Sequence, residues 1–105
     1  MPDRDDEART EAQAILDDLY GKYWDEAQKV PAPKETDLLK LERAYKEAVR
    51  EYAKLQGRLM TKDILTSPED LETFKKIRQQ MADAVELKSM ILAARDLIKL
   101  IIAIV

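Results

Sequence analysis

Residues 89–105 constrain the fold of this chain more than any other stretch. Only four of these 17 residues are not apolar: Ser89, Arg95, Asp96 and Lys99. Burying one Leu or Ile side chain stabilises a folded protein by roughly 1.5–3 kcal/mol, so it would be costly to leave this segment in water. The segment must therefore be covered by the chain's other helices, by another subunit or by lipid.

The composition indicates a single all-α domain over residues 1–105. The chain is 46% hydrophobic and 37% charged, which is typical of a folded protein with a densely charged surface. An all-β fold needs many tight turns, but the 105 residues include only two glycines and four prolines. We therefore expect one helical-bundle domain.

Apolar residues recur at helical spacings of three and four in three segments. These segments predict helices over about residues 5–29, 34–59 and 68–105. The first begins with acidic residues, which favour a helix N-terminus, and ends before Pro31 and Pro33. The third begins at Ser67-Pro68, because serine can cap the free amides and proline suits the first helical position. No Gly or Pro interrupts it before Val105.

The three predicted helices differ in length. At 1.5 Å per residue the third would measure roughly 55 Å, whereas the other two would each measure roughly 40 Å. The second has a heptad pattern, which is typical of helices packed at shallow angles, as in a coiled coil. We therefore predict an antiparallel three-helix bundle with a long third helix, whose apolar end projects beyond the others. The alternative is a four-helix bundle, in which the third helix breaks near residue 88 and folds back.

An apolar end that projects from its own protomer must be covered from outside. We therefore predict a structural or interaction module, which self-associates as a homo-oligomer or docks a protein partner through its C-terminal helix. The predicted interface residues are Ile91, Leu92, Leu97, Ile98, Ile101, Ile102, Ile104 and Val105. An engineered helical scaffold without a native biochemical role is an alternative, because the chain has neither Cys nor His.

Charged residues near the C-terminus argue against a membrane span. Arg95, Asp96 and Lys99 would each cost about 2.5–3.5 kcal/mol at membrane depth. Only six residues follow Lys99, whereas a span needs roughly 20. Lys88, Arg95 and Lys99 share one stripe, as on a helix that lies on a lipid surface, but the solvated edge of a buried helix is the favoured interpretation. The acidic N-terminus is not a secretory signal, so we expect a cytoplasmic protein.

Two residue types that carry much of protein chemistry are missing. Without Cys or His the chain has no thiolate nucleophile, no disulfide, no Cys-bound zinc and no imidazole metal ligand. A net charge of −3 gives no overall attraction to phosphate, so we expect no nucleic-acid partner. Acidic residues at 69–72 and 83–86 would be the ligands of a Mg²⁺-dependent hydrolase, but acids in a first helical turn are expected without a metal. We therefore predict no enzyme, and no catalytic, cofactor-binding or metal-ligating residue.

Tyr45 and Tyr52 lie seven residues apart on the apolar seam of the second predicted helix. Together with Tyr23 and Trp24 they could line a pocket for a small molecule. Aromatic residues at helical spacing are more often part of the core, with their polar tips at its edge. We therefore expect these four side chains to pack within the bundle.

Overall fold

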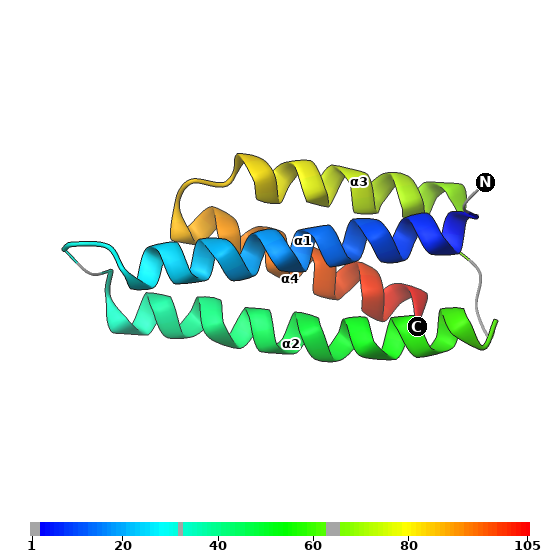
Figure 1. Cartoon of the computed structure of the whole chain (residues 1–105), viewed down its shortest axis with the longest axis horizontal. Coiled ribbons are helices and arrows are strands. Elements are labelled where there is room, and N and C mark those ends of the chain that lie inside the picture. The colour runs from blue at the N-terminus through cyan, green and yellow to red at the C-terminus, as the bar shows by residue number, and fades with distance from the viewer. Residues whose placement is uncertain (1–2, 32, 63–65) are drawn as a thin grey trace.

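The computed structural model describes residues 3–31, 33–62 and 66–105. Within these ranges the chain is all-helical and contains no strand. The helices are α1 Arg4–Ala27, α2 Glu35–Met60, α3 Pro68–Asp83 and α4 Leu87–Ile104 (Figure 1). The bounds of α1 and α2 differ from the predicted ones by at most two residues.

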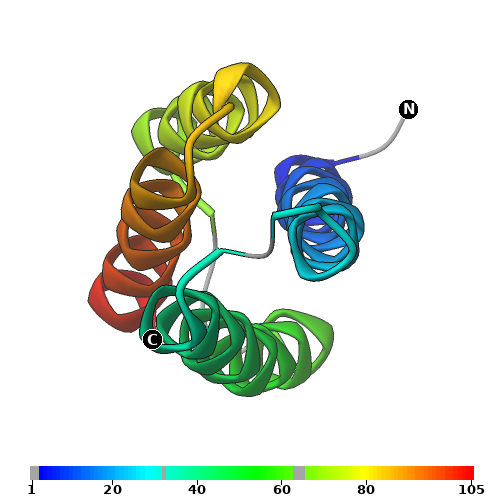
Figure 2. The same cartoon turned by 90° about the vertical axis from the view of Figure 1, so that its left-hand side faces the viewer.

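The helices form two antiparallel hairpins, α1–α2 and α3–α4, which pack together as a bundle (Figure 1). Around the bundle axis the order is α1, α2, α4, α3, so each helix packs against two neighbours (Figure 2). α1 and α4 touch across the diagonal, whereas α2 and α3 make no contact within the described ranges. As a result, α1 and α4 have their outer surfaces on opposite sides of the molecule (Figure 2).

The prediction of a single long third helix is wrong. The helix that begins at Pro68 ends at Asp83, and the chain folds back through residues 84–86 into α4. Ala84 and Glu86 have extended backbone dihedral angles, which interrupt the helix. The described part of the chain therefore matches the alternative, a four-helix arrangement with a break near residue 88. The apolar end does not project, because the C-terminus lies beside α2 and short of its far end (Figure 1).

The break brings the apolar stripes of α3 and α4 into one core. Leu97 and Ile101 of α4 are fully buried, as are Phe74 and Met81 of α3. Burying such side chains is worth roughly 1.5–3 kcal/mol each, and each helical hydrogen bond lost at the break costs only about 1 kcal/mol net. Burial therefore decides the arrangement. The other side chains with no exposed surface are Ala8, Ala12, Ile15, Leu19, Leu41, Ala48, Leu55, Ala93 and Ala94.

A lysine from α1 stabilises the corner between α3 and α4. The Lys22 ammonium donates to the carbonyl oxygen of Ala82 at 3.3 Å and to that of Ala84 at 2.6 Å. Carbonyls at a helix C-terminus lack partners within the helix, and the helix dipole there favours a cation. These contacts join positions 60 and 62 residues apart, so the corner depends on tertiary structure and not on a local stop signal.

Lys22→Met is expected to lower the free energy of unfolding by about 1–2 kcal/mol, because two carbonyls lose a charged donor while the apolar stem is kept. Urea denaturation followed by circular dichroism measures this loss. Lys75→Met is the matched control, since Lys75 is exposed on α3, and it should change stability by less than about 0.5 kcal/mol. Equal effects of the two substitutions would contradict a role for Lys22 at the corner.

Side-chain caps fix the starts of α1 and α3. The Asp3 carboxylate accepts a hydrogen bond from the Asp6 N–H at 2.8 Å. The Ser67 hydroxyl accepts one from the Asp70 N–H at 3.0 Å, which is the cap that the sequence predicts. Each cap supplies an acceptor to one of the first N–H groups of its helix, which have no partner within the helix.

Asp5 connects the start of α1 to the segment that precedes α3. Asp5 is 6% exposed, and its carboxylate accepts hydrogen bonds from the Thr66 N–H at 2.8 Å and the Lys62 ammonium at 3.4 Å. Burial raises the pKa of Asp5, but the hydrogen bonds from Thr66 and Lys62 and the charge of Lys62 outweigh it, so this pKa lies below its ordinary value. The ionised carboxylate therefore stabilises the fold.

Gly21 and Gly57 are exposed positions within α1 and α2, and a Cβ at either would meet no atom within 4 Å. Gly21→Ala and Gly57→Ala are each expected to raise the free energy of unfolding by about 0.5–1 kcal/mol, since alanine loses less backbone entropy in a helix. Thermal denaturation should show the gain as a higher Tm. Ala53→Gly, at an exposed position of α2, should lower the Tm by a similar amount. A lower Tm for Gly57→Ala would contradict this account.

Candidate functional site

The eight predicted interface residues fall into two groups. Most belong to the protomer's own core: Ile91, Leu97, Ile98 and Ile101 are buried, and Ile104 packs against them. Ile102 and Leu92 are 55% and 54% exposed, and Val105 is 36% exposed. The idea that the whole apolar end needs outside cover is therefore wrong, because α1, α2 and α3 cover most of it. Contact of any of these residues with a partner stays a prediction.

Five exposed residues of α4 share one outer surface, which we name the α4 stripe: Lys88, Leu92, Arg95, Lys99 and Ile102. They follow one another at spacings of three and four, so they lie on one side of the helix. None of the three cations forms an ion pair with a carboxylate within the described residues. The α4 stripe is thus a basic surface with two exposed aliphatic side chains.

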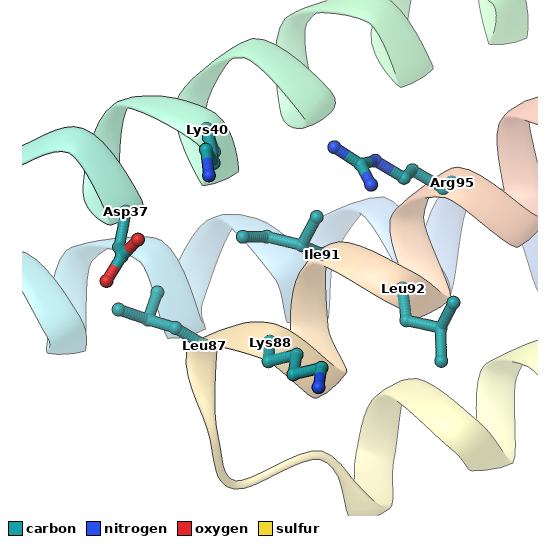
Figure 3. A pocket seen from close by; sticks show the side chains of 7 residues that line it. All are labelled: Asp37, Lys40, Leu87, Lys88, Ile91, Leu92 and Arg95. Carbon is teal, nitrogen blue, oxygen red and sulfur yellow. The ribbon is translucent and has the colours of Figure 1, made fainter.

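A groove of about 480 Å³ lies between α2 and the first half of α4 (Figure 3). We name it the α2–α4 groove, and its lining residues are Asp37, Lys40, Leu87, Lys88, Ile91, Leu92 and Arg95. Lys40 and Arg95 reach in from the two helices on either side of Ile91, and the Asp37 carboxylate lies beside Leu87 (Figure 3). Three cations thus surround an apolar floor, and only one carboxylate opposes them. Such a groove suits an apolar or aromatic group that is accompanied by negative charge.

The outer surface of α1 has the opposite character. We name it the α1 face: Asp17, Tyr20, Trp24 and Asp25, all exposed. Neither aspartate pairs with a cation in the part of the chain that the structure describes. The Trp24 ring makes edge contacts with Tyr20 and Tyr23, at centroid distances of 6.2 and 5.7 Å. The α1 face is therefore acidic, with an aromatic cluster at its centre.

The four aromatic residues named from the sequence are only partly in the core. Tyr52 is buried, and burial raises the pKa of its hydroxyl. Tyr23 and Tyr45 are half-buried and pack against the core, whereas Trp24 is 46% exposed. Sequence reasoning missed Tyr20, which is 49% exposed and lies 5.6 Å from the Tyr45 ring. The available signal was that Tyr20 and Trp24 fall outside the apolar stripe of their helix.

The acidic residues considered as metal ligands do not form a site. Glu69, Asp70 and Glu72 lie at the start of α3, and Asp83 and Glu86 lie at its other end. Across the described ranges, no three acidic side chains are grouped so that they could hold a metal ion. No helix in those ranges has both the length and the apolar character needed to cross a membrane.

Comparison of this chain with protein-family models, with curated proteins and with solved structures gave no match.

Proposed function

We propose that this chain is an interaction module, a helical bundle that self-associates through the outer surface of α4. The observation that carries the proposal is the α4 stripe, in which Leu92 and Ile102 are more than half exposed among three cations without ion pairs in the described residues. Exposed aliphatic side chains next to unpaired charges suit a contact that excludes water and pairs those charges.

The size of the stripe suggests a weak contact. Burying the exposed half of one Leu or Ile side chain contributes about 1 kcal/mol, and association must also overcome the loss of translational and rotational freedom. Two such residues with a few ion pairs at the rim are consistent with a dissociation constant in the micromolar to millimolar range. We therefore expect the oligomer to form and dissociate as the protein concentration changes.

Leu92→Gln/Ile102→Gln is expected to leave the Tm within a few degrees of the wild-type value, because both side chains lie largely outside the core. The same variant should lose self-association, because it removes the apolar part of the contact. Sedimentation equilibrium from micromolar to millimolar concentration measures the molar mass against the 12.1 kDa of one chain. Glu72→Gln/Lys76→Gln, at exposed positions of α3, is the matched control and should associate as the wild type does. A wild-type protein that stays at 12.1 kDa throughout would overturn the proposal.

A further inference from the structure

We infer that the self-association is head to tail: Trp24 on the α1 face of one copy inserts into the α2–α4 groove of the next copy. The inference rests on the proposed function, because it names the surface against which α4 packs. It assigns the partner as a second copy of this chain and identifies the residues on both sides of the contact.

The distribution of charge favours this pairing over a symmetric one. The α1 face has two aspartates and no cation, whereas the α4 stripe has three cations and no carboxylate. Two α4 stripes packed on each other would bring the cations of one copy close to those of the other, and like charges at a contact oppose binding. An α4 stripe packed on an α1 face brings opposite charges together instead.

The spacing of the charges also matches. Asp17 and Asp25 are eight residues apart, about 12 Å along α1, and Lys88 and Arg95 are seven residues apart, about 10.5 Å along α4. Trp24 lies between the two aspartates in the sequence, and the floor of the α2–α4 groove lies between the two cations. Two ion pairs can therefore form at the rim of one contact while the indole lies between them, close to the Asp25 end.

Trp24 is suited to be the anchor of this contact. Its ring already makes edge contacts with Tyr20 and Tyr23, which reduces the side-chain freedom that is lost when it binds. The α2–α4 groove, at about 480 Å³, is within the size range of protein binding sites. Lys40 and Arg95 reach into this groove, where a cation can lie over the face of an indole ring. Buried Trp side chains that fill a pocket are frequent centres of binding energy.

The position of the two surfaces requires that they come from different copies. Trp24 is not among the residues that line the groove of its own chain, and α1 and α4 lie diagonally across the bundle (Figure 2). A contact between two different surfaces leaves one α1 face and one groove free at the ends of the assembly. The assembly is therefore expected to grow past the dimer as concentration rises, unless the copies close into a ring.

The test uses complementation between two half-blocked variants. Leu92→Gln/Arg95→Gln blocks the groove and keeps the α1 face, whereas Trp24→Gln blocks the α1 face and keeps the groove. Trp24 is the only tryptophan of the chain, so in a mixture all indole fluorescence comes from the groove-blocked variant. Neutral replacements are used so that the two blocked surfaces gain no charges that could pair. Circular dichroism first verifies that each variant is folded.

Each variant alone is expected to stay at the mass of one chain, with the emission of a solvent-exposed tryptophan. Adding the Trp24→Gln variant to the groove-blocked variant should shift that emission to shorter wavelength and give a one-to-one complex that grows no further. Raising NaCl from about 0.05 M to about 1 M should weaken this complex, because its rim is ionic. The Trp24→Gln/Leu92→Gln/Arg95→Gln variant, with both surfaces blocked, is the control and should produce no shift.

Three results would overturn the inference. One is a wild-type protein that associates while its Trp24 emission does not change, and the second is a folded pair of variants that fails to complement. The third is a wild-type protein that stops at a dimer, while the groove-blocked variant is monomeric and Trp24→Gln still dimerises. That result would indicate a symmetric α4 contact. The proposed function survives each of these results as long as Leu92→Gln/Ile102→Gln loses association, whereas a monomeric wild type removes both. Should Trp24→Gln not fold, Asp17→Asn/Asp25→Asn removes both carboxylates of the α1 face without adding charge, and the mass of the mixture decides.

Discussion

Ile101→Asp is expected to lower the free energy of unfolding by more than about 4 kcal/mol, a large part of the roughly 5–15 kcal/mol that stabilises a small domain. Ile101 has no exposed surface and lies among the core residues of all four helices. A carboxylate there would be buried without a partner, and the aliphatic contacts would be lost as well. Circular dichroism and urea denaturation should report a protein that is largely unfolded or melts far below the wild type.

The neighbouring residue supplies the control for this prediction. Ile102 is 55% exposed on the α4 stripe, so Ile102→Asp introduces the same charge one position away without burying it. We expect Ile102→Asp to change stability by less than about 0.5 kcal/mol while weakening self-association. If Ile101→Asp and Ile102→Asp had the same Tm, α4 would not occupy the core in the orientation described.

Asp5→Ala is expected to lower the free energy of unfolding by about 2–3 kcal/mol at pH 7. The substitution removes the acceptor of the Thr66 N–H, which is bonded at 2.8 Å in a buried position, and a hydrogen bond to a charged group is worth about 1.5–3 kcal/mol. Asp5→Asn keeps an acceptor oxygen but no charge, so its loss should be smaller. Urea denaturation at pH 7 should rank the stabilities as wild type, Asp5→Asn, then Asp5→Ala.

The pH dependence of this loss follows from the direction of the pKa shift. The folded-state pKa of Asp5 lies below its ordinary value, and the unfolded chain binds this proton near pH 3.9. The stabilisation is therefore fully present well above pH 4 and is lost as the pH falls through the folded-state pKa. The difference in stability between wild type and Asp5→Ala should shrink as the pH approaches 3. Parallel stability profiles from pH 7 to pH 3 would contradict this role of the carboxylate.

Local sequence signals predict the helices of this chain well where a cap or a proline marks their ends. Pro31 and Pro33 follow α1, and Ser67-Pro68 marks the start of α3. Residues 84–86 carry no such signal, and the group that stabilises the corner there is Lys22, some 60 positions away. The difference in predicted helix lengths was the only sequence feature that pointed to a fold-back. The length difference did not decide between a projecting end and a corner. A partner could cover the apolar residues of a projecting end, and the chain's own helices cover them when the chain folds back.

The candidate surfaces are predictable to different degrees. Helical spacing places Lys88, Arg95 and Lys99 on one stripe, and the structure has all three exposed there. The α2–α4 groove also needs Lys40, and no periodicity within one helix indicates that α2 lies beside α4. The same spacing rules place Trp24 off the apolar stripe of α1, but they assign it no role until the opposite faces of the bundle are compared.

The Lys22 contact has a consequence for how the carboxyl-terminal half behaves by itself. No glycine or proline lies within residues 69–104 to end a helix, so a peptide of these residues has no local signal to bend where the intact chain does. The hairpin of α3 and α4 is imposed from outside, by an ammonium group carried on the first helix and by the apolar surfaces that the first two helices offer. Formation of the α3–α4 hairpin is therefore coupled to the presence of the α1–α2 hairpin.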